Sequence, residues 1–167
     1  MKMRAPVLHR SWGLPIAMAA VAAIGVIAMG STITTFDPWY RGLAQPDWAL
    51  SESRYGLAWT AIYLVTALAA VTGWRAMPDQ SGAEWMVGLF ALNGFLNIVW
   101  SLMVFRFHRP DWAALAAIGW WVAIALWIVV VWPRSTIAGW LLLPYLAWVT
   151  YAGYLTMMIV RLNGPFG

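Results

Sequence analysis

The sequence predicts an all-α membrane protein, a bundle of five transmembrane helices with a long loop between helices 1 and 2. Of its 167 residues, 63% are hydrophobic and only 10% are charged, with a mean hydropathy of +0.72. Soluble domains are about 25% charged. Five stretches of at least 20 residues lack Asp, Glu, Lys, Arg and His, and about 20 apolar residues suffice to cross a bilayer. The predicted spans are 14–36, 55–77, 85–107, 111–132 and 136–161, in one domain, 1–167.

The charges argue against a nucleic-acid-binding protein despite the net charge of +4. The ten Lys and Arg residues are scattered in ones and twos at the predicted helix ends, where they contact headgroups. A nucleic-acid site needs a basic face on a folded support. The chain contains no cysteine, which excludes disulfides, thiolate metal sites and cysteine nucleophiles.

The first span and the connection after it each allow two interpretations. The basic lead before Leu14, with Ala28-Met29-Gly30, is compatible with a cleaved signal, but the apolar run continues past Gly30, so we favour a retained span. The long connection 36–54 contains Trp39, Tyr40 and Trp48. These rings belong either to an interfacial aromatic belt or to a lid over one end of the bundle.

The third span carries the most informative residues. Asn93 and Asn97 are four positions apart and therefore share a helix face, which Trp100 continues. An amide that faces lipid without a partner is costly, so this face is expected to point into protein or a cavity. In the second span, Trp59 and Tyr63 also share a face.

The last two spans differ in character. We find no polar residue facing inward from the fourth span, and expect lipid or a partner subunit on much of its surface. The fifth span contains Pro144, which is expected to kink or locally unwind it. Tyr145 and Trp148 then follow on one stripe.

No catalytic constellation emerges, and no metal ligands are assigned. All six carboxylates lie outside the five charge-free stretches, so no Asp, Glu, Lys, Arg or His lies deep within a span, which argues against a pump or ion-coupled transporter. Arg106, His108 and Arg109 are candidates for contacting an anionic group, or simply lipid phosphate. The amide, hydroxyl and indole groups inside the spans predict either a Trp-lined pocket for a flat apolar ligand or plain interhelical packing.

Six ordered motifs carry a family resemblance: Trp39-Tyr40-x-x-Leu43-x-x-Pro46-x-Trp48, Trp59-Thr60-x-x-Tyr63, Leu96-Asn97-x-x-Trp100-Ser101, His108-Arg109-Pro110, Pro144-Tyr145-Leu146-x-Trp148 and Leu162-Asn163. Together they resemble the TspO/MBR family, the tryptophan-rich sensory proteins related to the mitochondrial translocator protein or peripheral benzodiazepine receptor. The resemblance implies a five-helix bundle, often dimeric, that binds porphyrins and, in some members, sterols. The ligand-binding residues are predicted to be Trp39, Trp48, Trp59, Tyr63, Asn93, Asn97, Trp100, Tyr145 and Trp148.

Three departures from the family pattern bear on ligand preference. Ala49-Leu50 stands where a Pro-Pro pair is usual, Asn93 replaces a glutamine, and Thr156 replaces an asparagine. The sterol pattern is not met near the fifth span, because Tyr154 lies seven positions before Arg161.

We therefore expect an integral membrane receptor or sensor that binds a porphyrin-like tetrapyrrole or another flat apolar ligand, with no cofactor required. The alternatives are a transporter, a photo-oxidative degrader of porphyrins that uses Trp59 and Trp148, and a structural subunit of a pigment-containing membrane complex. The expected partners are the lipid bilayer, a porphyrin or a sterol, and a second copy in a homodimer. A bacterial cell membrane is favoured, with the outer membrane as the alternative.

Overall fold

The computed structural model describes residues 33, 34 and 36–166, so nearly all of the first predicted span lies outside the described residues. In the described part the chain forms α-helices and no strands. A short helix, α2 (Pro38–Arg41), precedes four long ones, which are α3 (Glu52–Ala76), α4 (Gln80–Phe105), α5 (Pro110–Val131) and α6 (Thr136–Asn163). Each long helix overlaps one of the spans predicted from the sequence.

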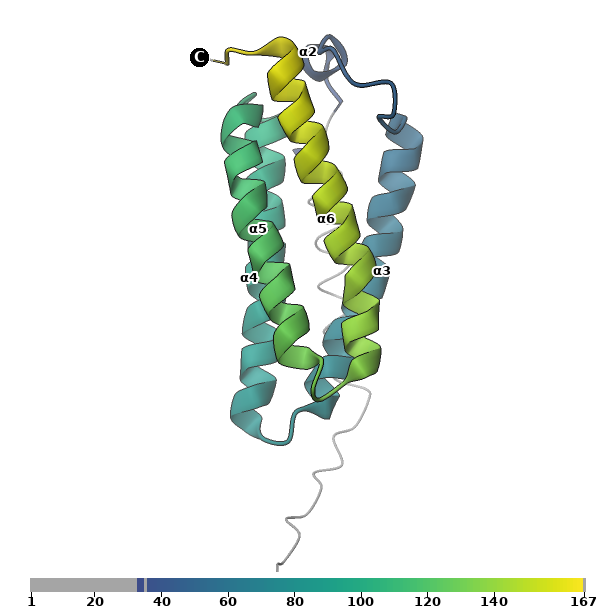
Figure 1. Cartoon of the computed structure of the whole chain (residues 1–167), viewed down its shortest axis with the longest axis vertical. Coiled ribbons are helices and arrows are strands. Elements are labelled where there is room, and N and C mark those ends of the chain that lie inside the picture. The colour runs from purple at the N-terminus through teal and green to yellow at the C-terminus, as the bar shows by residue number, and fades with distance from the viewer. Residues whose placement is uncertain (1–32, 35, 167) are drawn as a thin grey trace, which may run out of the picture.

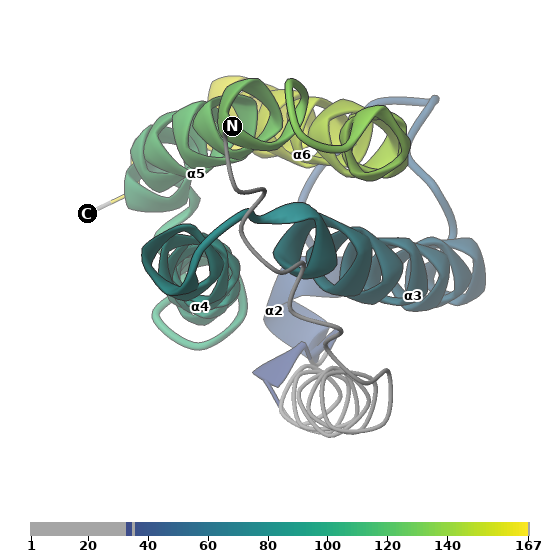
Figure 2. The same ribbon diagram turned by 90° about the horizontal axis from the view of Figure 1, so that it is seen from below.

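The four long helices run alongside one another as a bundle (Figure 1). Seen along the bundle axis, α5 lies between α4 and α6, and α3 lies beside both α4 and α6 (Figure 2). The α3–α4 and α5–α6 turns lie at one end of the bundle, whereas α2, its flanking loop and the end of α6 lie at the other (Figure 1). The polar and aromatic loop predicted between the first two spans therefore covers one end of the helices.

Local signals explain where the helices begin. Asp79 precedes α4, and its side chain accepts a hydrogen bond from Gly82 N at 2.7 Å. Ser135 precedes α6 and accepts from Ala138 N at 3.2 Å. Both are side-chain caps that satisfy a backbone N–H otherwise left without a partner. Pro110 begins α5, a position that suits it because the first turn of a helix tolerates its missing N–H.

The proline within α6 does not interrupt the helix. The assigned helix continues through Pro144 to Asn163, so the local unwinding allowed for from the sequence is not found. Close helix contact is visible instead at Gly73 of α3. A Cβ atom there would lie 2.5 Å from Met86 Cε and 2.8 Å from Val131 Cγ2, so any larger residue would force these two side chains to shift.

The four long helices are each apolar and long enough to cross a membrane, and only about a third of each apolar window is buried inside the protein. Their outward faces carry large apolar side chains such as Leu64 on α3, Phe95 on α4 and Val129 on α5. Such surfaces suit lipid rather than water. The chain is thus an integral, multi-pass membrane protein of the all-α class.

Candidate functional site

Four tryptophans, one from each long helix, meet inside the bundle. The Trp59 ring stacks on the Trp120 ring, with centroids 5.9 Å apart and planes 4° from parallel. The edge of Trp148 meets Trp59 at 5.6 Å, and Trp100 lies 6.5 Å from Trp59 and 5.8 Å from Trp120. Offset stacks and edge contacts are the favoured geometries for aromatic pairs. We call Trp59, Trp100, Trp120 and Trp148 the tryptophan cluster.

Two hydrogen bonds link polar side chains within and beside the tryptophan cluster. The Tyr63 hydroxyl donates to Asn97 Oδ1 at 3.2 Å, and the Tyr63 ring stacks on Trp59 at 5.1 Å. In addition, Trp120 Nε1 donates to the Tyr145 hydroxyl at 2.9 Å. The first bond joins α3 to α4, and the second joins α5 to α6. Six of the predicted ligand-binding residues therefore share one interior region: Trp59, Tyr63, Asn97, Trp100, Tyr145 and Trp148.

The expectation that no polar group of the fourth span faces inward is wrong. Trp120 of α5 is fully buried, and its indole N–H takes part in a hydrogen bond to another helix. A sequence signal for this was present, because Ala113, Ala117, Trp120 and Ile124 recur at helical spacing and are all buried. The two small alanines precede the large indole on this buried stripe of α5. The outward face of α5 is apolar and exposed, as expected.

Several buried N–H donors in and beside the cluster have no acceptor among the described residues. Trp100 Nε1, Trp148 Nε1 and Asn97 Nδ2 are buried and make no hydrogen bond with the part of the chain that the structure describes. An indole N–H only donates, so each such group can be satisfied only by an acceptor. A buried donor without a partner costs about 1–3 kcal/mol. The region is therefore suited to a guest that brings hydrogen-bond acceptors.

Asn93 differs from Asn97 although both are buried, as predicted, on the inward face of α4. Its Nδ2 donates at 2.9 Å to the carbonyl of Leu89 in its own helix. Its Oδ1 is buried and has no donor among the residues described. Asn93 thus lies one helical turn from Asn97. Among the described residues its group without a partner is an acceptor, Oδ1, whereas that of Asn97 is a donor, Nδ2.

The segment 36–51, which we call the cap, is fastened to the end of α6. Asn163 forms a two-way bond with the backbone of Ala44: Ala44 N donates to Asn163 Oδ1 at 2.7 Å and Asn163 Nδ2 donates to Ala44 O at 2.8 Å. Leu50 N donates to the Tyr151 hydroxyl at 3.0 Å. The cap is therefore an ordered cover held by specific bonds, in agreement with the lid interpretation of its sequence.

The cap is also joined to the turn between α4 and α5. His108 Nε2 lies 3.0 Å from Asp37 Oδ2, and its ring stacks on Trp39 at 4.0 Å. His108 has a φ of 52°, in the left-handed region that is uncommon for residues other than glycine. Arg109 forms an ion pair with Asp111 at 2.6 Å. Two of the three predicted anion-contacting residues are thus paired with carboxylates of the chain, and the charge of the third, Arg106, helps to lower the pKa of Asp37.

The two cap tryptophans do not join the cluster. Trp39 packs on His108, and Trp48, which is 43% exposed, packs against Tyr151 and Tyr154. Tyr151 in turn stacks on Trp148 of the cluster at 5.1 Å. The cap and the interior are therefore in contact through Tyr151, a residue that was not among the predicted site residues.

A cavity of about 220 Å³ lies beneath the cap. Tyr55 separates it from the tryptophan cluster, because its ring lies 5.4 Å from Trp148 and 6.3 Å from Trp59. Burial raises the pKa of Tyr40, another wall residue, to about 12, so its hydroxyl stays neutral. The described lining residues are Phe36, Tyr40, Arg41, Gln45, Leu50, Ser51, Glu52, Tyr55 and Leu155.

Comparison with known proteins gives a consistent result. The family model described as the TspO/MBR family matches residues 17–162. The chain is 33% identical to the tryptophan-rich protein TspO of Chlorobaculum tepidum, over 82% of this chain and 90% of that protein. It is 28% identical to the tryptophan-rich sensory protein of Cereibacter sphaeroides, over 93% and 95% of the two chains. It is also 28% identical to the translocator protein of Sus scrofa, over 75% of each.

The matched segment contains the tryptophan cluster, the cap and the four described membrane helices except Asn163, the last residue of α6. The resemblance inferred from the ordered motifs is thus confirmed, and the chain belongs to the TspO/MBR family.

Proposed function

We propose that the protein is a membrane receptor for a flat, largely apolar ligand that carries hydrogen-bond acceptors, with a porphyrin-like tetrapyrrole as the chemical class. The observation that carries the proposal is the set of buried donors Trp100 Nε1, Trp148 Nε1 and Asn97 Nδ2 among stacked aromatic rings. Apolar aromatic walls with few polar anchors are typical of small-molecule sites. A protein built only for close helix packing would gain by replacing these donors with apolar groups.

The cavity beneath the cap supports the same proposal, with a limit on size. Complete small-molecule sites occupy roughly 300–1,000 Å³, more than the 220 Å³ described here. A tetrapyrrole-sized ligand therefore places one edge in the cavity. Space for the remainder of the ligand requires the aromatic side chains next to the cavity to move. Tyr55 lies at this junction, between the cavity and Trp148.

A titration of the purified protein in lipid nanodiscs tests the proposal. Protoporphyrin IX is added to wild type, to Trp148→Phe, to Asn97→Leu and to the control Trp85→Phe, and quenching of tryptophan fluorescence is followed. Trp85 is 69% exposed on α4 and is therefore a matched indole outside the cluster. Saturable binding is expected in wild type and control, weakened about tenfold in each of the other two by loss of one donor. Equal quenching in all four, or in empty nanodiscs, would contradict the proposal.

The contact between Trp59 and Trp148 favours light-dependent porphyrin breakdown as a second candidate. The two rings are in edge-to-face contact at 5.6 Å, so a ligand that contacts one of them lies close to the other. Illumination of the bound complex is expected to bleach the porphyrin absorption bands in wild type and not in Trp59→Phe or Trp148→Phe. Bleaching at the same rate in both variants and in free porphyrin would rule it out.

Location and assembly belong to the same proposal. Two of the relatives named above are bacterial, which supports the cell membrane of a bacterium as its site. The homodimer implied by the resemblance stays a prediction. Cross-linking in native membranes is the measurement that checks it.

A further inference from the structure

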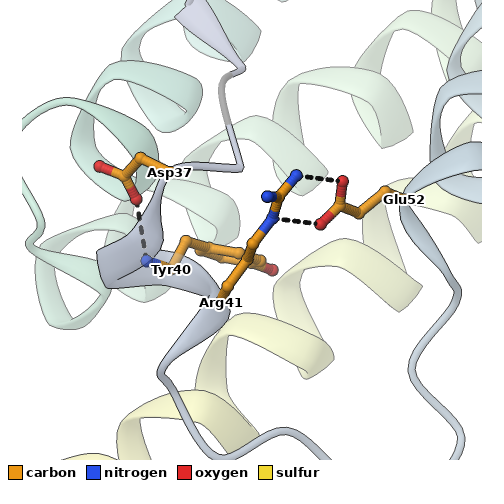
Figure 3. Close-up of polar contacts among 4 residues, drawn as sticks. All are labelled: Asp37, Tyr40, Arg41 and Glu52. Carbon is orange, nitrogen blue, oxygen red and sulfur yellow. Dashed lines mark hydrogen bonds and ion pairs between the residues drawn. The ribbon is translucent and has the colours of Figure 1, made fainter.

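One ion pair of the cap faces the cavity. Arg41 Nε donates to Glu52 Oε1 at 2.8 Å, and Arg41 Nη2 donates to Glu52 Oε2 at 2.9 Å. This is the parallel two-bond geometry that matches a guanidinium to a carboxylate. Figure 3 shows the Arg41 side chain extending from α2 to Glu52 at the start of α3, with the Tyr40 ring extending in the same direction. Arg41, Glu52 and Tyr40 all line the cavity.

We propose that Arg41 recognises an acidic group of the ligand, and that Glu52 occupies its guanidinium until the ligand's carboxylate replaces it. The inference rests on the proposed function and deepens it, because it names carboxylic acids as the preferred ligands. It also assigns the contact with an anionic group to Arg41, whereas the sequence suggested Arg106, His108 and Arg109.

The charges around the cavity select Arg41. Among the described lining residues it is the only cation, and Glu52 is the only carboxylate. His108 and Arg109, which also pair with carboxylates, do not line the cavity. An acidic ligand that enters beneath the cap therefore meets a single guanidinium, whose fork of donors is already arranged for two carboxylate oxygens.

The exposure of the pair makes an exchange feasible. The Arg41 and Glu52 side chains are 62% and 47% exposed, and ion pairs in contact with water contribute little to stability because water and salt screen them. The released Glu52 carboxylate would be solvated at the surface. The incoming carboxylate would keep the same two bonds, while the apolar body of the ligand contacts Phe36 and Tyr55 on the other walls.

The test compares protoporphyrin IX, which has two propionate groups, with its dimethyl ester, which has the same ring and no charge. Affinities for both are measured in nanodiscs for wild type, Arg41→Gln, Glu52→Gln and the control Arg54→Gln. Arg54 is an exposed arginine in the first turn of α3 and is not among the cavity-lining residues. Nanodiscs of neutral lipid keep headgroup charge out of the comparison.

Wild type is expected to bind the acid about tenfold more tightly than the ester, as one charge-assisted contact allows. Arg41→Gln is expected to remove this preference and to leave ester affinity unchanged. Glu52→Gln is expected to increase acid affinity several-fold without affecting the ester, because the competing carboxylate is gone. Arg54→Gln is expected to behave as wild type.

Ester binding serves as the control for folding, since a variant that still binds the ester has kept its site. An acid-to-ester ratio unchanged in Arg41→Gln would overturn the assignment of Arg41. A lower acid affinity in Glu52→Gln would overturn the exchange and make Glu52 a positioning residue. If wild type binds neither compound saturably, the proposed function itself fails, and that outcome is distinct from the other two.

Discussion

The interior of the bundle and the cap are held together in different ways. The interior consists of rings and aliphatic side chains in close contact, and among the described residues few hydrogen bonds join one helix to another and some buried donors have no acceptor. The cap packs Phe36 and Tyr40 against Phe105 and in addition makes polar contacts with three parts of the chain: Glu52 of α3, His108 between α4 and α5, and Asn163 of α6. We therefore expect the bundle to unfold as one unit, and the cap to open while the helices stay packed.

Replacement of Trp120 by alanine is the most damaging change that we predict. Its ring is fully buried and contacts Trp59, Trp100 and Tyr145. Its removal leaves a cavity at the junction of four helices, and we expect a loss of about 3 kcal/mol in the free energy of unfolding. This value is at the lower end of the range for buried tryptophans in soluble proteins. In a membrane the hydrophobic contribution is largely absent, so mainly the loss of packing contacts destabilises the variant.

Unfolding in mixed micelles with increasing SDS measures this loss. Trp85→Ala is the control, because Trp85 is 69% exposed on α4, and its replacement is expected to change stability by less than about 0.5 kcal/mol. Equal effects of the two substitutions would mean that the interior is not held by ring packing.

Removal of the cap's link to α6 is expected to have a smaller and local effect. Asn163→Ala eliminates the two-way bond with the Ala44 backbone, and two hydrogen bonds contribute about 1–2 kcal/mol together. Cap opening should therefore become about 5–30 times more frequent, with little change in the unfolding of the bundle.

Limited trypsin digestion detects this opening, because Arg41 is a cleavage site within the cap. Its cleavage rate should rise in Asn163→Ala while the SDS midpoint stays at the wild-type value. Asn163→Asp, which keeps the acceptor for Ala44 N and loses the donor, should lie between the two. A parallel fall in bundle stability would show that the cap and the helices form one cooperative unit.

The contrast between the interior and the cap also explains which parts of the structure can be predicted from the sequence. Membrane-spanning helices are predictable because the required apolar length is a local property, and buried amides such as Asn97 reveal which face turns inward. The ordered motifs place six residues in one region. The link between Asn163 and Ala44 joins residues 119 positions apart through a backbone group, which any residue possesses. No pattern in the sequence specifies such a contact.

Trp120 and Arg41 escape prediction from the sequence for different reasons. The hydropathy of the fourth span does not indicate that Trp120 faces inward, although small buried alanines precede it on the same stripe. Arg41 has the sequence context of an ordinary charge at a helix end, and the role that we propose for it depends on the cavity that α2 and α3 line together. Side chains that act through tertiary arrangement are thus the part of the site that composition and spacing do not reveal.

The smallest effect is expected at the Asp37–His108 contact. The pKa of Asp37 is lowered from its ordinary value of 3.8, first by the hydrogen bond from Tyr40 N and further by His108. Because the folded pKa is depressed, this anchor contributes fully above pH 3.8 and is lost as the pH falls through the lower folded value. Both side chains are more than 30% exposed, so the contribution is small.

Hydrogen exchange at the Tyr40 amide, corrected for intrinsic rates, follows this anchor from pH 5 to pH 2.5. Wild type should lose protection below pH 3.8. Asp37→Asn retains an acceptor for Tyr40 N but cannot ionise, so it should show weaker protection that does not change over this range. A transition of equal size in the variant would show that another carboxylate near α2, rather than Asp37, fastens this corner of the cap.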